Sequence, residues 1–162
     1  MSTLGTLHRT EDGRVALRFE RRLRHPQAKV WRAISETDQL RAWFVQLLDY
    51  DRFRLDLVPG ARIAFVDRQG TVAGEGEVVR VDPPKLLEYT WGSEILRFEL
   101  EPDGDDGCRL VFTNIVDDPA AAPELGAGWH AGLDALEALL DGRPAEASVS
   151  HELQTTYQRA LA

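Results

Sequence analysis

The polar residues that could do chemistry in this chain stand singly on apolar stretches. Asn114 shares one face of a strand-like run with Leu110 and Phe112. An inward-facing amide near a strand end either satisfies backbone groups of the next segment or hydrogen-bonds a bound molecule, and both interpretations stay open. His130 follows Trp129 in a helical pattern, about 100° around the helix from it, which indicates a histidine in contact with solvent.

Glu77 could supply an acid or a base, depending on the register of its strand. The strand-like run Thr71 to Val81 contains two glycines, which indicate a bulge or the close approach of another backbone. If the valines at the end of this run face the interior, strict alternation turns Glu77 inward, whereas a bulge at Gly76 reverses it. Burial would raise the pKa of an inward carboxyl unless a cation such as Arg97 paired with it. An inward, unpaired Glu77 is therefore expected to stay protonated and to donate a hydrogen bond to a ligand.

Known catalytic and metal-binding motifs do not occur in the sequence. The four histidines are far apart, Cys108 is the single cysteine, and no HExxH pattern is present. The sequence also contains no GxSxG, Walker or GxGxxG motif in a suitable context. We therefore expect no metal, no cofactor and no catalytic residue, and we interpret Cys108 as a small buried hydrophobic residue.

Four tryptophans lie on faces that the patterns indicate are apolar. An indole buries a large area and still needs a partner for its N–H, so several indoles around one helix suggest a pocket wall. We interpret Trp31 as core and Trp129 as the buried centre of a long helix. Trp43 and Trp91 are predicted at the mouth of a cavity, because the first follows two short helices and the second ends a strand. On this expectation, Trp129→Ala costs about 3–5 kcal/mol, more than any change at Trp43.

The element that must position these residues is a long helix over Glu124 to Gly142. Apolar residues recur in it at spacings of three and four, which places them on one stripe. Pro123 suits the start of the helix, and Gly142 followed by Pro144 suits its end. The stripe has to be buried, and it consists of Leu125, Trp129, Leu133, Leu136 and Leu140.

Seven strand-like runs precede the long helix. The first covers Arg14 to Arg24 and alternates apolar with charged residues, interrupted only by Arg21. Two short helices follow it, over Pro26 to Ser35 and Asp38 to Phe44. The other six runs are separated by turns and tight loops, and they cover residues 53–57, 63–65, 71–81, 85–91, 94–101 and 107–116.

These elements predict an α+β fold. A long antiparallel sheet of seven strands with one apolar face would curve around the terminal helix, and the two short helices would close one end. We expect a single domain over residues 1–162, with a core from about 14 to 142 and a C-terminal tail from 143 to 162. Residues 1–13 are expected to be frayed. The tail either docks through Leu153, Tyr157 and Leu161 or stays loose.

Composition narrows the range of partners. The chain has 19 basic and 27 acidic residues and a formal net charge of -8, which argues against nucleic acid or an anionic membrane. No apolar run reaches the roughly 20 residues of a membrane span, and the first residues lack the features of a signal peptide. We therefore expect a cytoplasmic protein, monomeric or homodimeric, with no nucleic-acid or membrane partner.

Three segments resemble a known family in their order and spacing. They are VWRAISETDQLRAWF, DPPKLLEYTW and GWHAGLDALEALLDG, at residues 30–44, 82–91 and 128–142. Over about residues 15–142 the chain is similar to the activator of heat-shock-protein-90 ATPase homologue (AHSA-like) family of the START-like superfamily, also called SRPBCC or birch-pollen-allergen-like. The resemblance implies a helix-grip fold, in which a seven-stranded sheet grips a long C-terminal helix, often around a hydrophobic cavity.

The resemblance leads to three functional hypotheses. The first is a module that binds a small hydrophobic or aromatic molecule in an enclosed cavity of about 300 Å³ or more. The second is an enzyme, since the superfamily includes cyclases, aromatases and hydrolases of aromatic or polyketide substrates. The third is a co-chaperone-like module with a protein partner. For the first hypothesis, the residues predicted to bind the ligand are Trp43, Phe65, Glu77, Tyr89, Trp91, Phe98, Phe112, Asn114, Trp129 and Leu133.

Overall fold

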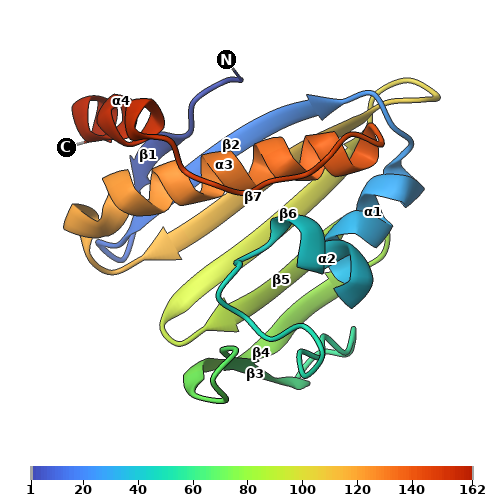
Figure 1. Ribbon diagram of the computed structural model, residues 1–162, viewed down its shortest axis with the longest axis horizontal. Coiled ribbons are helices and arrows are strands. Elements are labelled where there is room, and N and C mark those ends of the chain that lie inside the picture. Colours follow the sequence, from blue (N-terminus) through green and yellow to red (C-terminus); the bar gives the residue numbers. More distant parts are fainter. Residues whose placement is uncertain (1, 162) are drawn as a thin grey trace.

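The structure is a computed structural model that describes residues 2–161. Met1 and Ala162, the outermost residues of the predicted frayed start and C-terminal tail, lie outside the described residues. One antiparallel sheet forms a layer, and a long helix, α3 (Ala122–Leu140), lies across one face of it (Figure 1). The strands are β1 (Thr6–Arg9), β2 (Val15–Leu23), β3 (Arg62–Val66), β4 (Val72–Asp82), β5 (Leu86–Trp91), β6 (Glu94–Pro102) and β7 (Cys108–Val116), in the spatial order β1-β2-β7-β6-β5-β4-β3.

In residues 2–161 three further α-helices contact α3, and a 3-10 helix, η1 (Pro119–Ala121), directly precedes it. The short helices α1 (Gln27–Ser35) and α2 (Thr37–Trp43) follow β2, and α4 (His151–Leu161) ends the chain. Figure 1 shows α1 and α2 beside one end of α3, and α4 beside the other end, close to the N-terminus. The chain between α3 and α4 runs back along α3. The predicted α+β helix-grip architecture is confirmed, and none of the helices in residues 2–161 is long and apolar enough to cross a membrane.

The sheet has seven strands as predicted, but one of them is a different segment. Residues 53–57 form no strand, whereas Thr6–Arg9, within the stretch expected to be frayed, pairs with β2. Apolar residues alternate at 53–57 because Phe53 is buried and Leu55 and Leu57 pack against the core. The segment meets the core without pairing with a neighbouring strand. The polar β1 instead hydrogen-bonds to the free edge of β2, which requires no apolar pattern.

The inward face of β2 follows the predicted alternation and also buries the residue that interrupts it. Arg21 is buried; its Nη1 donates a hydrogen bond to the Thr3 carbonyl at 2.6 Å, and its Nη2 lies 3.6 Å from the Asp134 carboxylate. Burial lowers the pKa of the Arg21 guanidinium, and Asp134 opposes this shift. Arg21 therefore links the N-terminal segment to α3. On β7, Cys108 is buried as predicted, and burial raises the pKa of its thiol to about 11.

The C-terminal tail docks on α3. Tyr157 is fully buried, and its hydroxyl accepts a hydrogen bond from the Gly5 backbone N–H at 2.9 Å and lies 2.7 Å from Nδ1 of His130. Gly126 permits this contact, because a Cβ atom there would lie 2.8 Å from the Tyr157 ring. The prediction of a solvent-facing His130 is wrong, since α4 covers the edge of α3 on which it lies.

On the outer face of the sheet, the buried carboxylate of Glu88 pairs with two arginines. Arg97 donates to the carboxylate of Glu88 at 2.5 Å, and Arg80 donates to the same oxygen at 2.9 Å. Burial opposes the ionisation of Glu88, but the two arginines outweigh it and hold the pKa of the carboxyl below its usual value. The sequence suggests Arg97 as a partner for an inward Glu77, but in the structure Arg97 pairs with Glu88.

We expect Glu88→Gln to lower the free energy of unfolding by about 1–3 kcal/mol at pH 7, because both arginines lose a charged acceptor. A depressed folded-state pKa stabilises the fold above the unfolded pKa, and this contribution disappears as the pH falls through the folded value. Urea melts at pH 7 and pH 3 should therefore show a difference that narrows in acid. Glu99→Gln, at an exposed position on the same face, is the control; a difference for Glu88→Gln that is equal at both pH values would contradict the charge argument.

Candidate functional site

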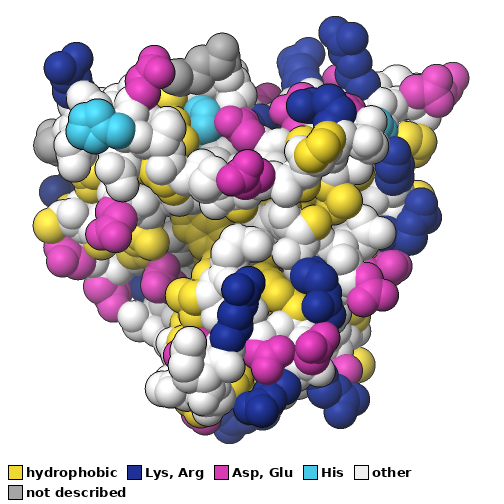
Figure 2. All heavy atoms as spheres, in the orientation of Figure 1, with side chains coloured by type: hydrophobic (Ala, Val, Ile, Leu, Met, Phe, Trp, Pro, Cys, Tyr) yellow, Lys and Arg dark blue, Asp and Glu magenta, His cyan; other side chains and the backbone are white. Residues whose placement is uncertain are grey.

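An apolar cavity of about 250 Å³ lies between α3 and the segment that follows α2. Figure 2 shows hydrophobic side chains gathered in a recess in the middle of the face that Figure 1 presents. The returning chain between α3 and α4 forms part of the rim. The cavity is lined by Trp43, Phe44, Val45, Gln46, Glu124, Leu125, Gly128, Trp129, Gly132, Ala147 and Val149.

Two glycines one helical turn apart on α3 shape this cavity. A Cβ atom at Gly128 would meet no atom within 4 Å, so the missing side chain leaves open space. At Gly132 a Cβ atom would lie 3.2 Å from the carbonyl oxygen of Trp43, so this glycine lets the end of α2 approach the helix. Each glycine in a helix interior costs up to about 1 kcal/mol relative to alanine. The two glycines therefore lower the stability of α3 at the positions of the cavity and of the close contact with α2.

Two indole rings line the cavity, and their N–H groups are hydrogen-bonded to other parts of the protein. Nε1–H of Trp43 donates to the Ala33 carbonyl at 2.8 Å, and Nε1–H of Trp129 donates to the Asn114 side-chain oxygen at 3.0 Å. Both polar atoms of the indoles are thus satisfied inside the protein. A molecule in the cavity would meet these rings as apolar surfaces.

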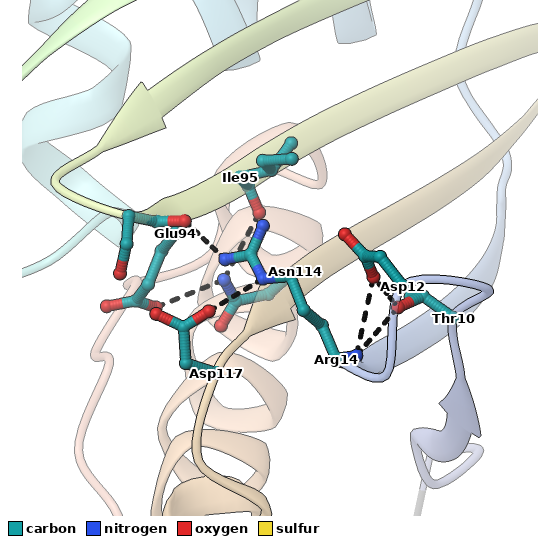
Figure 3. A network of polar contacts seen from close by, with 8 residues as sticks. Thr10, Asp12, Arg14, Glu94, Ile95, Asn114 and Asp117 are labelled. Atoms are coloured by element: carbon teal, nitrogen blue, oxygen red, sulfur yellow. Dashed lines mark hydrogen bonds and ion pairs between the residues drawn. The ribbon is translucent and has the colours of Figure 1, made fainter.

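Asn114 holds one of these walls in place. Its side-chain nitrogen donates to the carboxylate of Glu94 at 3.1 Å and to the carbonyl of Ile95 at 3.2 Å, while its oxygen accepts from Trp129. Figure 3 shows Asn114 on β7 reaching across to Glu94 and Ile95, with Arg14 and Asp117 beside them. Of the two interpretations from the sequence, this network matches the structural one, in which the amide satisfies its neighbours and orients Trp129.

Most of the predicted ligand-binding residues lie in the closed core. Of the ten, only Trp43 and Trp129 line the cavity. Ring contacts fill the space between sheet and helix, for example from Phe98 to Phe112 at 4.8 Å and from Phe112 to Trp129 at 4.7 Å between centroids. The other core residues of the predicted set are Phe65, Tyr89 and Leu133, all of them buried.

The two tryptophans predicted at the cavity mouth lie elsewhere than expected. Trp43 is only 1% exposed, because the rings of Phe44 and Phe98 pack against it at 5.5 and 6.2 Å. Trp91 is half-buried and stacks on Phe65 at 3.8 Å, and its Nε1–H donates to the Ala73 carbonyl at 3.2 Å. Trp43 is therefore a wall without solvent contact, and Trp91 belongs to a different part of the sheet. Trp31, predicted as core, is half-buried.

Glu77 is exposed, so the prediction of an inward carboxyl is wrong. The register between β4 and β5 shifts between Val78 and Arg80. As a result Val78 is buried and Val79, the residue between them, is 40% exposed. The predicted close approach of another backbone does occur at Gly76, where a Cβ atom would lie 1.8 Å from the Thr90 carbonyl oxygen. Glu77 is thus excluded as a polar anchor in the cavity.

The sequence patterns did not identify several of the residues that line the cavity. The glycines at positions 128 and 132 were a usable signal, since their spacing of four places them on one face of the predicted helix. Ala147 and Val149 gave no signal, because they come from a polar linker whose path depends on the docking of α4. Residues 2–161 contain no group of three or more His, Cys, Asp or Glu side chains placed to hold a metal ion.

Comparisons with known proteins agree with this fold. The family model described as Activator of Hsp90 ATPase homolog 1-like protein matches residues 24–141. The conserved protein of unknown function EF2215 from Enterococcus faecalis has a similar structure, with a TM-score of 0.75 and 20% identity over 96% of this chain and 88% of that chain. A comparison with curated proteins finds no match.

Two further solved structures are similar over nearly the whole chain. CalU16 from Micromonospora echinospora has a TM-score of 0.71 and 23% identity, covering 99% of this chain and 94% of that chain. The protein encoded by gene BPP1335 of Bordetella parapertussis has a TM-score of 0.68 and 26% identity, covering 98% of this chain and 91% of that chain. These similarities concern the fold, since sequence identity is low throughout.

Proposed function

Because the chain belongs to the family of Activator of Hsp90 ATPase homolog 1-like proteins, in the SRPBCC superfamily of helix-grip folds, we propose that it binds a small apolar molecule. Folds of this type typically bind hydrophobic ligands. The observation that carries the proposal is the cavity of about 250 Å³ between α3 and the segment after α2, with walls of Trp43, Phe44 and Trp129.

The size of the cavity limits the ligand. Pockets for drug-sized molecules measure about 300–1,000 Å³, whereas a cavity of about 150 Å³ in another protein holds benzene. A volume of about 250 Å³ suits a molecule of one or two aromatic rings. Flat rings also match the two indoles, because aromatic pairs gain about 0.5–1.5 kcal/mol beyond the area that they bury.

The lining favours binding without chemical conversion. Its single ionisable side chain is Glu124, which lies exposed in the first turn of α3. A general acid or base has to lie within about 2.6–3.2 Å of the proton that it transfers, either directly or through one water. Most of the lining surface is apolar, with Gln46 and Glu124 as its polar side chains, so the geometry supports a carrier or sensor of an apolar compound.

A titration with naphthalene, followed by tryptophan fluorescence, tests the proposal. We expect a saturable change with a Kd on the order of 10–100 μM, since a ligand of ten heavy atoms has limited binding energy. The indoles at positions 43 and 129 report on the cavity directly, because both line it. A change that stays linear up to the solubility limit of naphthalene would contradict binding at a defined site.

A further inference from the structure

Tyr89 on β5 carries a buried hydroxyl that has no hydrogen-bond partner among residues 2–161. The whole side chain is inaccessible to solvent. Buried polar atoms are almost always paired, because an unpaired one loses its hydrogen bonds to water without replacement. An acceptor brought to this hydroxyl would therefore replace the hydrogen bonds to water that burial removed.

A second tyrosine nearby shows the paired arrangement. Tyr50 is also buried, but its hydroxyl donates to the Val45 carbonyl at 2.7 Å. Burial raises the pKa of both phenols, and the proximity of Tyr50 adds to the rise at Tyr89. Both groups are thus neutral at physiological pH and able to donate. The proton of Tyr50 is engaged, whereas that of Tyr89 is available.

Phe44, which follows α2, contacts both the cavity and the ring of Tyr89. Phe44 lines the cavity, and its ring lies 5.7 Å from the ring of Trp129 and 6.4 Å from the ring of Tyr89. Val45, whose carbonyl Tyr50 holds, lines the cavity as well. A displacement of the Phe44 ring would therefore extend the cavity from Trp129 toward the ring of Tyr89.

We propose that a ligand displaces the Phe44 ring and accepts a hydrogen bond from the hydroxyl of Tyr89, so that the preferred ligands are aromatic carbonyl compounds. This inference rests on the proposed function. A carbonyl oxygen suits this position because it accepts a hydrogen bond and carries no donor that would itself need an acceptor. The N–H groups of Trp43 and Trp129 are already engaged, as is the side-chain nitrogen of Gln46. The hydroxyl of Tyr89, in contrast, is free to donate.

Two ligands of nearly equal shape test the inference. The Kd values of 2-acetylnaphthalene, which has a carbonyl, and of 2-isopropylnaphthalene, which has none, are measured for the wild type, Tyr89→Phe and Tyr50→Phe. In Tyr89→Phe we expect the preference for the ketone over the hydrocarbon to fall by roughly tenfold, the worth of one hydrogen bond. In Tyr50→Phe the preference should stay as in the wild type, because that hydroxyl is already paired.

The outcomes separate the two proposals. If both ligands bind and Tyr89→Phe keeps the wild-type preference, the hydrogen bond to Tyr89 is refuted and the apolar site stands. If neither ligand binds to the wild type, both proposals are refuted. Urea melts give an independent readout: Tyr89→Phe should unfold at a midpoint equal to or above that of the wild type, and Tyr50→Phe below it. A loss in Tyr89→Phe as large as that in Tyr50→Phe would reveal an internal partner and overturn the inference.

Discussion

Trp43→Ala is expected to lower the free energy of unfolding by about 3–5 kcal/mol, at least as much as Trp129→Ala. Trp43 is 1% exposed and Trp129 is 9% exposed. Truncation of Trp43 also removes the donor to the Ala33 carbonyl and the contacts with the rings of Phe44 and Phe98. This order differs from the one expected from the sequence, where Trp43 was placed at a rim with solvent to replace its contacts.

Urea melts of the alanine variants measure these losses. Trp31→Ala is the matched control, because this third indole is half-buried on α1 and should cost less than either buried one. Unchanged m-values are required for the comparison, since they show that the variants unfold from equally compact states. A smaller loss for Trp43→Ala than for Trp31→Ala would contradict the described packing of α2 on α3.

Gly128→Leu is expected to weaken naphthalene binding by more than about thirtyfold without destabilising the protein. A Cβ atom at this position meets no atom within 4 Å, so a leucine side chain has room to enter the cavity and occupy the space of the ligand. Replacing glycine in a helix interior also stabilises the helix by up to about 1 kcal/mol. The variant should therefore fold at least as well as the wild type while it loses the binding site.

Gly128→Ala separates the two effects of this substitution. It gains helix propensity, but its single methyl group leaves most of the cavity open. Binding close to that of the wild type is expected for Gly128→Ala, together with a similar rise in stability. Equal binding by the alanine and leucine variants would show that naphthalene binds elsewhere on the protein.

The architecture was predictable because its main elements carry strong local patterns. The alternation in β2 reflects its buried face, the apolar stripe marks the large side chains that α3 buries, and the strand and helix periods differ clearly. The sheet edge was not predictable in the same way. The strand Thr6–Arg9 is polar and is held by backbone pairing with β2. Backbone pairing alone does not produce an apolar periodicity in the residues of the strand.

The candidate site was predicted less well, because side-chain direction depends on single-residue shifts and on distant packing. The irregularity at Val79 reverses the direction of Glu77, and alternation alone does not reveal where an extra residue is inserted. His130 is buried because α4 returns to cover it, although 27 residues separate it from Tyr157. Trp129 was identified as the centre of the helix because its environment follows from the helical stripe alone.

The most direct test of the account is the position of bound naphthalene in solution, measured by intermolecular nuclear Overhauser effects to the labelled protein. We expect contacts with the indole protons of Trp43 and Trp129 and with the methyl groups of Val149, since these side chains surround the cavity. Naphthalene contacts confined to Trp91 or to the exposed Val72 would place the ligand on a different part of the sheet. That result would contradict the assignment of the cavity beside α3 as the binding site.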